Sequence, residues 1–255
     1  MILPESGFPS FPVPFPERLH RGIAGLQRTR QVRTLQGLYL LATSGLALGL
    51  ELRQALGRQL GMDPEGGSLK RLFRVDLPGL DLAACETLDF INGSRLAVLR
   101  LNPEGKALSR ALNWPVVENE WERLVRQHAG LRYPQHTVGL LAFCYHARLR
   151  DWQVTLLPQV NANVEPDARV TKGSQSCYVE FEVRPHGKLE KWQKSDAFQG
   201  SVAIATFTPS LRAGLVQECR DVRVPGQATD LQTLAQAARR QAPGPLWLEA
   251  WHAGW

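Results

Sequence analysis

Apolar and polar positions in the N-terminal part of the chain alternate with the spacing of amphipathic helices. Helices are predicted at residues 27–43 and 48–60, because glycine or Asp-Pro signals follow each segment. Ser68 is placed to cap a third short helix at 69–74. The basic side chains of this third helix are Lys70, Arg71 and Arg74. Residues 1–20, rich in proline and phenylalanine, predict an extended arm before the helices.

Two strand-like segments, 88–91 and 95–101, flank Asn92-Gly93-Ser94 and predict a β-hairpin. Three helices followed by a two-stranded hairpin are the elements of a winged helix-turn-helix. In such a domain the third helix would enter the major groove of DNA, and Arg95 and Arg100 of the hairpin would lie near phosphates. An ordinary small helical domain with a solvated basic helix is the alternative that this pattern leaves open.

Trp114-Pro115 marks a predicted domain boundary, after which the pattern changes. Apolar stripes predict helices at 117–128 and 135–150, and we expect His128, at the end of the first stripe, to be a core histidine. Short strands and helices then alternate, which predicts an α/β domain with a mixed central sheet. The strands fall at residues 152–157, 167–171, 178–183, 201–206 and 246–250, and the helices at 186–199, 209–219 and 231–240. The predicted organisation is an arm at 1–20, a winged helix-turn-helix at 21–113 and a second domain at 114–255.

Three carboxylates are predicted to gather on two paired strands of the second domain. Period-two alternation puts Glu180 and Glu182 on one face of their strand. If the hairpin closes symmetrically around Gly173-Ser174, Asp167 lies opposite Glu180. Like charges at that spacing repel each other, and Mg²⁺ bound by Asp167 and Glu180 would reverse the repulsion.

The competing interpretation is a solvated sheet face, where the carboxylates pair with Arg169 or Arg184 and stabilise by at most about 1 kcal/mol. Basic groups just downstream favour a catalytic role for the carboxylates, because a cation beside them could hold a phosphate or a water nucleophile. These groups are Arg184, His186, Lys188, Lys191 and Lys194. A solvated helix face with Glu190 and Asp196 as partners explains them equally well.

Pro166-Asp167 followed by Glu180-Phe181-Glu182 resembles the signature of the PD-(D/E)xK nuclease-like fold. The resemblance implies catalytic roles for Asp167, Glu180 and Glu182, with Asp167 and Glu180 as Mg²⁺ ligands. Glu182 stands where that fold most often has lysine, and Lys188 would supply the missing cation.

The order of short motifs along the chain is similar to that of the replication-relaxation family of bacterial and plasmid proteins. The motifs are residues 99–108, 136–141, 152–158, 166–168, 180–182, 188–192 and 202–209. Proteins of this family join an N-terminal winged helix to a C-terminal nuclease-like domain. The resemblance therefore implies DNA binding in the biology of a plasmid or mobile element.

Composition narrows the class of protein. The chain has 255 residues, of which 44% are hydrophobic and 21% charged, as in a globular protein with a substantial core. Thirty basic and 24 acidic side chains give a net charge of +6 and a pI near 9.4, which suits an anionic partner such as double-stranded DNA. Residues 1–112 hold 14 basic and 10 acidic side chains, so the excess leans towards the N-terminal half.

The cysteines and one apolar segment bear on the compartment. The cysteines are Cys85, Cys144, Cys177 and Cys219. They form no C-x-x-C pair, which predicts reduced, mostly buried thiols in a cytoplasmic protein. The uncharged segment at 34–50 is at the short limit of a membrane span, but its glycines favour two helices with a turn. No membrane partner is expected.

Three functions remain open on these observations. The first is a DNA-binding protein of replication initiation or transcriptional control, whose nuclease-like domain is a scaffold. Its predicted DNA contacts are Lys70, Arg71, Arg74, Arg95 and Arg100. The second is an Mg²⁺-dependent endonuclease; no other cofactor is expected. The third is a protein-interaction component that docks a protein partner or a second copy of the chain through the arm and Trp247, Trp251 and Trp255.

Overall fold

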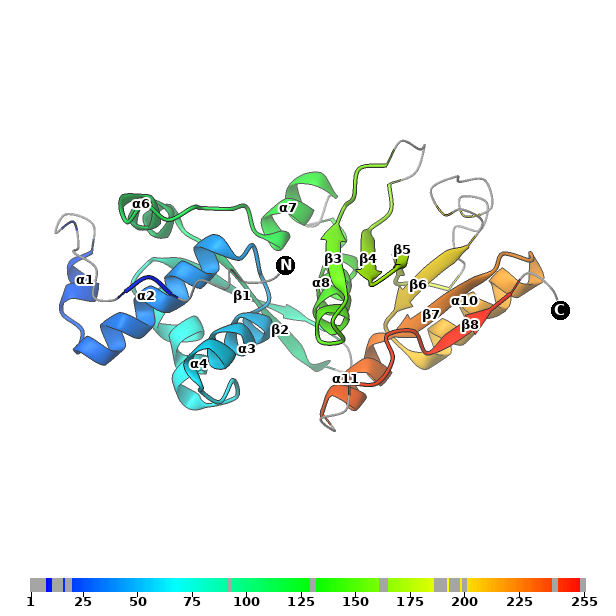
Figure 1. Cartoon of the computed structure of the whole chain (residues 1–255), viewed down its shortest axis with the longest axis horizontal. Helices are drawn as coiled ribbons and strands as arrows, with labels where there is room; N and C mark the ends of the chain where they lie inside the picture. Colours follow the sequence, from blue (N-terminus) through cyan, green and yellow to red (C-terminus); the bar gives the residue numbers. More distant parts are fainter. Residues whose placement is uncertain are drawn as a thin grey trace. The chain divides into compact units, whose positions relative to one another are not determined.

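The computed structural model of the chain describes residues 8–10, 16, 20–90, 93–128, 132–160, 165–185, 192, 198, 201–239 and 243–252. They form a mixed α/β protein whose chain divides into two compact units (Figure 1). The first unit is Met1–Asp89 with Ser94–Ala129, and the second is Phe90–Gly93 with Gly130–Trp255. Most of the predicted arm at 1–20 lies outside the described residues.

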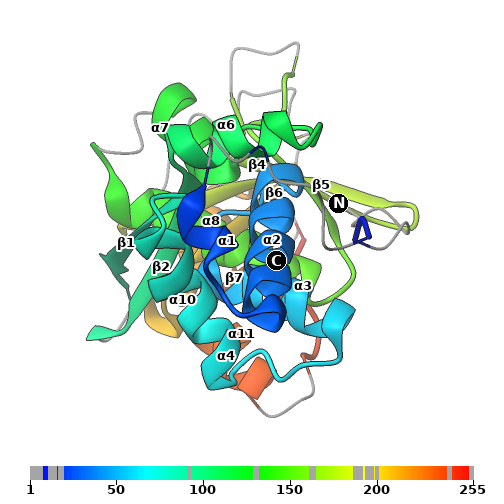
Figure 2. The same ribbon diagram turned by 90° about the vertical axis from the view of Figure 1, so that its left-hand side faces the viewer.

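The first unit combines helices with a two-stranded hairpin. Its elements are α1 (Arg21–Ala24), α2 (Arg28–Thr43), α3 (Gly49–Leu60), α4 (Gly67–Arg71), η1 (Leu72–Asp76), α5 (Leu77–Gly79), β1 (Ala83–Asp89), β2 (Arg95–Leu101), α6 (Pro103–Ala111) and α7 (Glu120–Gln127). Helices α2 and α3 confirm the helices predicted at 27–43 and 48–60. Helix α3 packs between α2 and α4 (Figure 2).

The third helix is longer than predicted, because α4 continues into the π-helical turn η1 and then into α5. Helix α4 begins at Gly67 after the extended residue Gly66. Ser68 therefore lies inside the helix and does not cap it, which corrects the predicted cap. The apolar side of this helix packs into the core of the unit through Leu69, Leu72, Phe73 and Leu77.

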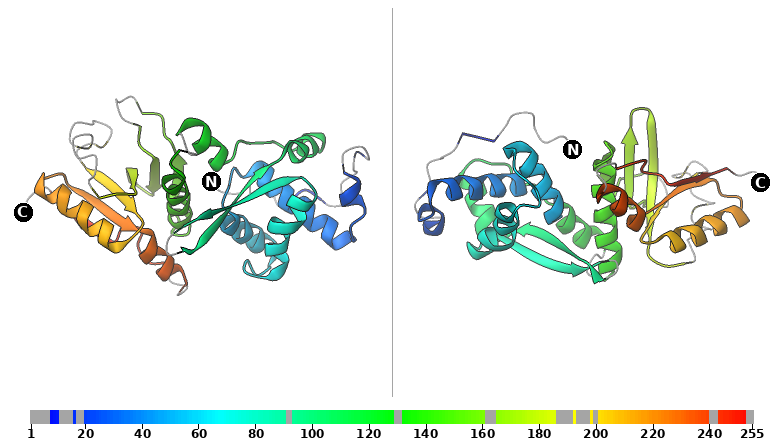
Figure 3. Two further views of the ribbon diagram at one scale, coloured as in Figure 1. Left: turned by 180° about the vertical axis from the view of Figure 1, so that it is seen from behind. Right: turned by 90° about the horizontal axis from the view of Figure 1, so that it is seen from below.

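The predicted hairpin is confirmed, although its first strand begins at Ala83 and not at 88. Strands β1 and β2 pair antiparallel along their whole length (Figure 3). The connection between α2 and α3 adds a single β-bridge to the outer side of β2. Leu48 bridges Val98 in the antiparallel sense, and the Leu99 amide donates to the Ala47 carbonyl at 2.8 Å.

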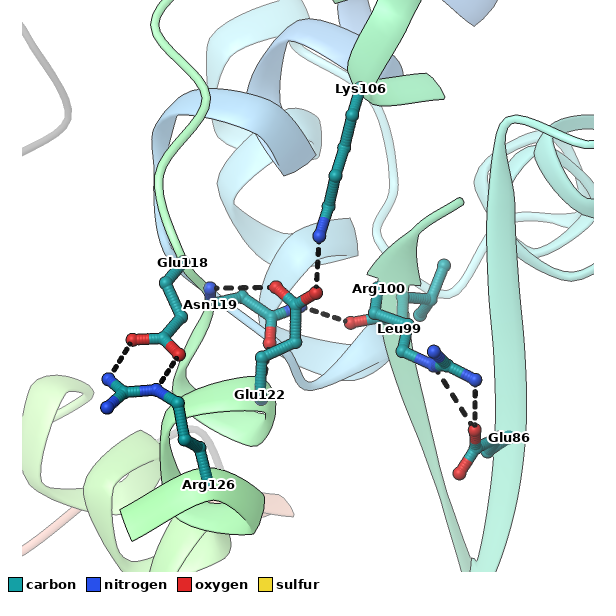
Figure 4. Close-up of polar contacts among 8 residues, drawn as sticks. All are labelled: Glu86, Leu99, Arg100, Lys106, Glu118, Asn119, Glu122 and Arg126. Atoms are coloured by element: carbon teal, nitrogen blue, oxygen red, sulfur yellow. Dashed lines mark hydrogen bonds and ion pairs between the residues drawn. The ribbon is translucent and has the colours of Figure 1, made fainter. Parts of the chain in front are cut away.

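The division between the units falls after residue 129, whereas the sequence predicts a domain boundary at Trp114. Trp114 packs in the core of the first unit, edge-on to Tyr39 at a ring-centroid distance of 5.2 Å. Helix α7 attaches to the same unit, since Asn119 caps it and donates through Nδ2 to the Leu99 carbonyl at 2.7 Å (Figure 4). Trp114 is therefore buried within one unit, while Pro115 is exposed.

The second unit is built on a mixed six-stranded sheet in the order β3-β4-β5-β6-β7-β8. Its elements are α8 (Pro134–Arg148), β3 (Gln153–Leu156), β4 (Ala168–Lys172), β5 (Gln175–Glu182), β6 (Val202–Thr206), α10 (Pro209–Asp221), β7 (Gly226–Asp230), α11 (Leu231–Arg239) and β8 (Glu249–Trp251). Strands β5, β6 and β7 run parallel, and the other neighbours pair antiparallel. The sequence did not predict β7, and the helix predicted at 186–199 lies outside the described residues except for 192 and 198.

Helices cover both faces of this sheet at its centre, since β6 is buried at all five positions. Val202 and Ile204 pack with Leu215 of α10. The alternate residues face α8, which approaches so closely that a Cβ at Gly139 would clash with the Phe181 ring. This close approach places the start of α8 beside β5.

The uncharged segment at 34–50 is not one continuous helix. Helix α2 ends at Thr43, Gly45 turns the chain with φ of +71°, and α3 begins at Gly49. Among the described residues, no helix is long and apolar enough to cross a membrane. All four cysteines are reduced thiols; Cys144 and Cys219 are buried, and Cys85 and Cys177 are half-buried.

Candidate functional site

The third helix of the first unit presents a cationic stripe to solvent. The helix stripe consists of the exposed residues Ser68, Arg71, Arg74 and Val75. Their spacing of three to four positions places them along one side of the helix, opposite the side that enters the core. Val75 is 55% exposed, so an apolar side chain stands among the arginines. Two of the predicted DNA contacts, Arg71 and Arg74, therefore share one accessible surface.

Lys70 lies next to the helix stripe and pairs with Glu65, with Nζ 3.0 Å from Oε2. The buried Arg53 of α3 donates to Glu65 at 3.1 Å and to the Pro64 carbonyl at 3.0 Å. Burial acts to raise the pKa of Glu65, but the hydrogen bonds from Lys70 and Arg53 outweigh it and lower that pKa. These contacts fix the turn between α3 and α4.

A buried carboxylate, Asp76 of η1, connects the helix stripe to α2. Asp76 accepts hydrogen bonds from Arg30 Nη2 at 2.6 Å and from Arg71 Nε at 3.3 Å. The hydrogen bond and the charge of Asp76 raise the pKa of Arg30. This contact is not predictable from the sequence, because 46 positions separate Arg30 from Asp76 and no local pattern joins them.

The hairpin carries the two remaining predicted DNA contacts. Arg95 pairs with Asp89 of the facing strand at 3.2 Å. Figure 4 shows Arg100, which pairs with Glu86 at 3.2 Å. Exposed ion pairs of this kind contribute at most about 1 kcal/mol. Exchange of either carboxylate for a DNA phosphate therefore costs little.

In the second unit, the strand register predicted for the acidic residues is confirmed up to Ala168. Strands β4 and β5 pair symmetrically around Gly173-Ser174 as far as Ala168↔Val179, and Gly173 has the positive φ, +58°, that the tight turn needs. The ladder ends at that pair. Asp167 Oδ2 instead accepts a hydrogen bond from the Phe181 amide at 2.7 Å. A side chain thus takes the place of a backbone partner.

His136, in the first turn of α8, shares the same carboxylate oxygen and was not predicted as a site residue. Its Nε2 lies 3.1 Å from Asp167 Oδ2, and its ring meets the Phe181 ring edge-on at 5.8 Å between centroids. The two side chains are only 13% and 4% exposed. Such a pair can hold or move a proton, or supply two ligands to a divalent ion.

Glu180 and Glu182 are buried, so they do not lie on a solvated sheet face as the competing interpretation required. They share a face of β5 with Tyr178, which packs against the core under α10. Within the described residues, Asp167, Glu180 and Glu182 are not a group whose oxygens all lie within 4.8 Å of one another. The three carboxylates therefore do not form one compact ligand set, and Mg²⁺ bound by Asp167 and Glu180 alone stays a prediction. Lys188 lies outside the described residues.

The tryptophans proposed as docking elements pack within the second unit. Trp247 lies edge-on to Trp152 at 6.4 Å between ring centroids, and Trp251 Nε1 donates to the Val224 carbonyl at 2.7 Å. Trp255 lies outside the described residues. The two described tryptophans therefore serve the fold of their own unit.

No protein-family model matches this sequence, and no curated protein and no solved structure matches it either. The likeness to the replication-relaxation proteins stays a prediction that rests on the motif order of this chain.

Proposed function

We propose that the first unit binds double-stranded DNA as a winged helix-turn-helix, and that the protein acts in replication initiation or transcriptional control of a plasmid or mobile element. The observation that carries the proposal is the order and pairing of the elements. Helix α2, helix α3 and the continuous segment α4–η1–α5 precede the hairpin, and the connection between α2 and α3 pairs with β2 through Leu48 and Val98. A hairpin joined in this way to the helices is the wing of such a domain.

The charges of this unit support the same function. Arg74 of the helix stripe would meet a guanine edge in the major groove, and Val75 would offer an apolar contact to a thymine methyl group. Arg95 and Arg100 of the hairpin would hold backbone phosphates. In this proposal the second unit is a nuclease-like scaffold.

The test is binding of the full chain to a short mixed-sequence DNA duplex, followed by fluorescence anisotropy at several salt concentrations. We expect log K to fall linearly with log salt, by about 0.9 for each phosphate contact. Arg74→Glu should weaken binding about tenfold or more, because a base contact is lost and a repulsive charge is added. Lys70→Glu combined with Arg71→Glu should abolish retention at moderate salt.

Arg110→Glu is the matched control, since Arg110 is an exposed arginine of α6 outside the proposed interface. It makes the same change in net charge and should cost much less affinity. Equal losses for Arg74→Glu and Arg110→Glu would indicate a general charge effect and no specific surface. Unchanged binding by the Lys70 and Arg71 double variant would contradict the proposal.

A further inference from the structure

We propose that Asp76 holds Arg30 and Arg71 together as one binding site for a single backbone phosphate of DNA. This inference rests on the proposed DNA-binding function and extends it to α2. It adds Arg30 to the interface and makes Asp76 a positioning residue that does not itself touch DNA.

The π-helical turn explains how Arg71 and Asp76 meet. They are five positions apart, whereas neighbours on an α-helix are three or four positions apart. Turn η1, at Leu72–Asp76, makes i→i+5 hydrogen bonds, which stack residue 76 over residue 71. π-Helical turns are rare in proteins overall, but those that occur often lie at functional sites. Here the wider turn places a carboxylate behind a DNA-facing arginine.

Arg30 reaches the same carboxylate from α2, with Nη2 2.6 Å from Oδ1 and Nε 3.4 Å from Oδ2. Both guanidinium groups touch Oδ1, so their remaining N–H groups lie within reach of one phosphate. The Asp76 side chain is 7% exposed, while those of Arg30 and Arg71 are 43% and 61% exposed. The carboxylate is therefore shielded, and two arginines against one carboxylate leave a charge of +1 for one phosphate.

The start of α2 adds a positive electrostatic potential to the positive charge of this site. Its first turn holds no acidic residue, and the N-cap Gln27 makes no side-chain capping bond. The positive end of the helix dipole and the unpaired N–H groups of the first turn thus accompany Arg30. A basic first turn is unfavourable for a helix by itself, and a bound anion relieves it.

A double-variant cycle on the full chain tests whether the two arginines act on one phosphate. Arg30→Gln and Arg71→Gln should each lower affinity for the duplex about tenfold. If the two share one phosphate, the double variant should also lose about tenfold, and not the roughly hundredfold product expected of independent contacts. Arg28→Gln is the matched control, because Arg28 lies in the same turn and is exposed. It should change affinity less than about threefold.

Asp76→Asn tests positioning by the sign of its effect. The variant raises the net charge by one, so electrostatics alone would tighten DNA binding. Positioning predicts weaker binding, by several-fold. Thermal melting checks that the variant folds, and if it does not, the arginine cycle alone decides.

Three results would overturn the inference while leaving DNA binding intact: an Arg30→Gln loss no larger than that of Arg28→Gln, a hundredfold loss in the double variant, or tighter binding by a folded Asp76→Asn. Failure of the wild-type protein to bind DNA would overturn the proposed function and the phosphate site with it.

Discussion

Arg150 of the second unit is a buried ionisable side chain whose hydrogen bonds go to backbone groups. Arg150 is 3% exposed and donates to three carbonyls, those of His146, Leu234 and Pro245. Burial lowers the pKa of Arg150. The three carbonyls accept hydrogen bonds from the N–H groups of its planar guanidinium. One residue thereby ties the end of α8 to α11 and to the segment before β8.

His146 makes the stability of the second unit depend on pH. Burial, with a smaller effect of the nearby Arg150, lowers the pKa of His146 to about 3. The unfolded chain takes up a proton at this histidine below its usual pKa of about 6.5, whereas the folded chain does not. We therefore expect the free energy of unfolding to fall by about 1.4 kcal/mol for each pH unit below 6.5, until the pH reaches about 3.

Urea unfolding of the wild type and His146→Leu at several pH values measures this contribution. The variant should lose less stability on acidification, by the amount that His146 contributes. His252→Leu, at an exposed position, is the control for removal of a histidine. Identical pH dependence of wild type and His146→Leu would mean that the folded protein protonates this imidazole.

Single residues of the candidate sites were predictable where their neighbours are close in sequence. The register of β4 against β5 up to Ala168 follows from strand periodicity and a tight turn, both of which act locally. The partner of Asp167 on α8, His136, is 31 positions away and depends on helix packing. The contact between Arg71 and Asp76 was missed for another reason, since it needs a π-helical turn that α-helical spacing does not predict.

At the scale of elements, α7 depends on one buried asparagine. Asn119 Oδ1 accepts from the Glu122 amide at 2.9 Å, and its Nδ2 donates to the Leu99 carbonyl. We expect Asn119→Ala to lower the free energy of unfolding by about 2–3 kcal/mol, because α7 loses its N-cap and the Leu99 carbonyl loses its hydrogen-bond donor. Asn119→Ser keeps a capping oxygen but cannot reach Leu99, so it should cost about 1 kcal/mol less.

Urea unfolding of the two variants separates the cap from the contact to β2. A loss below about 0.5 kcal/mol in Asn119→Ala would show that neither contact matters to stability. Equal losses in both variants would assign the effect to the hydrogen bond with Leu99 alone.

Helices and amphipathic strands were predicted from their periods, and the missed element shows the limit of that approach. Strand β7 has the polar sequence Gly-Gln-Ala-Thr-Asp, yet it lies in the parallel centre of the sheet. Asp230 is fully buried there because Arg212 pairs with it at 2.6 Å and the Thr233 amide donates to it at 2.7 Å. Tertiary partners make this strand possible, and a hydrophobic pattern does not report them.

At the scale of the whole molecule, the division after residue 129 changes the distribution of charge. The first unit contains 16 basic and 13 acidic side chains, and the second contains 14 and 11. Each unit therefore carries an excess of three positive charges, so the excess is no longer larger in the N-terminal part of the chain. The DNA-binding proposal rests on where the arginines are exposed, since net charge does not distinguish the units.

Incubation of supercoiled plasmid with Mg²⁺ or Mn²⁺ decides between a binding protein and an endonuclease. We expect no cleavage, because the three described carboxylates do not gather within 4.8 Å and Glu182 stands where the nuclease-like signature that the sequence resembles has lysine. Cleavage by the wild type that is lost in Asp167→Asn and Glu180→Gln would establish the endonuclease. Cleavage by all three proteins alike would indicate a contaminating nuclease.

The ends of the six-stranded sheet bear on how this protein behaves at high concentration. Its two outer strands are short, with four residues in β3 and three in β8. Long unpaired strands are templates on which other chains add by backbone hydrogen bonding, and short ones offer few free groups. The brevity of β3 and β8 therefore protects the sheet from growth into aggregates, while the parallel strands β5, β6 and β7 lie between them.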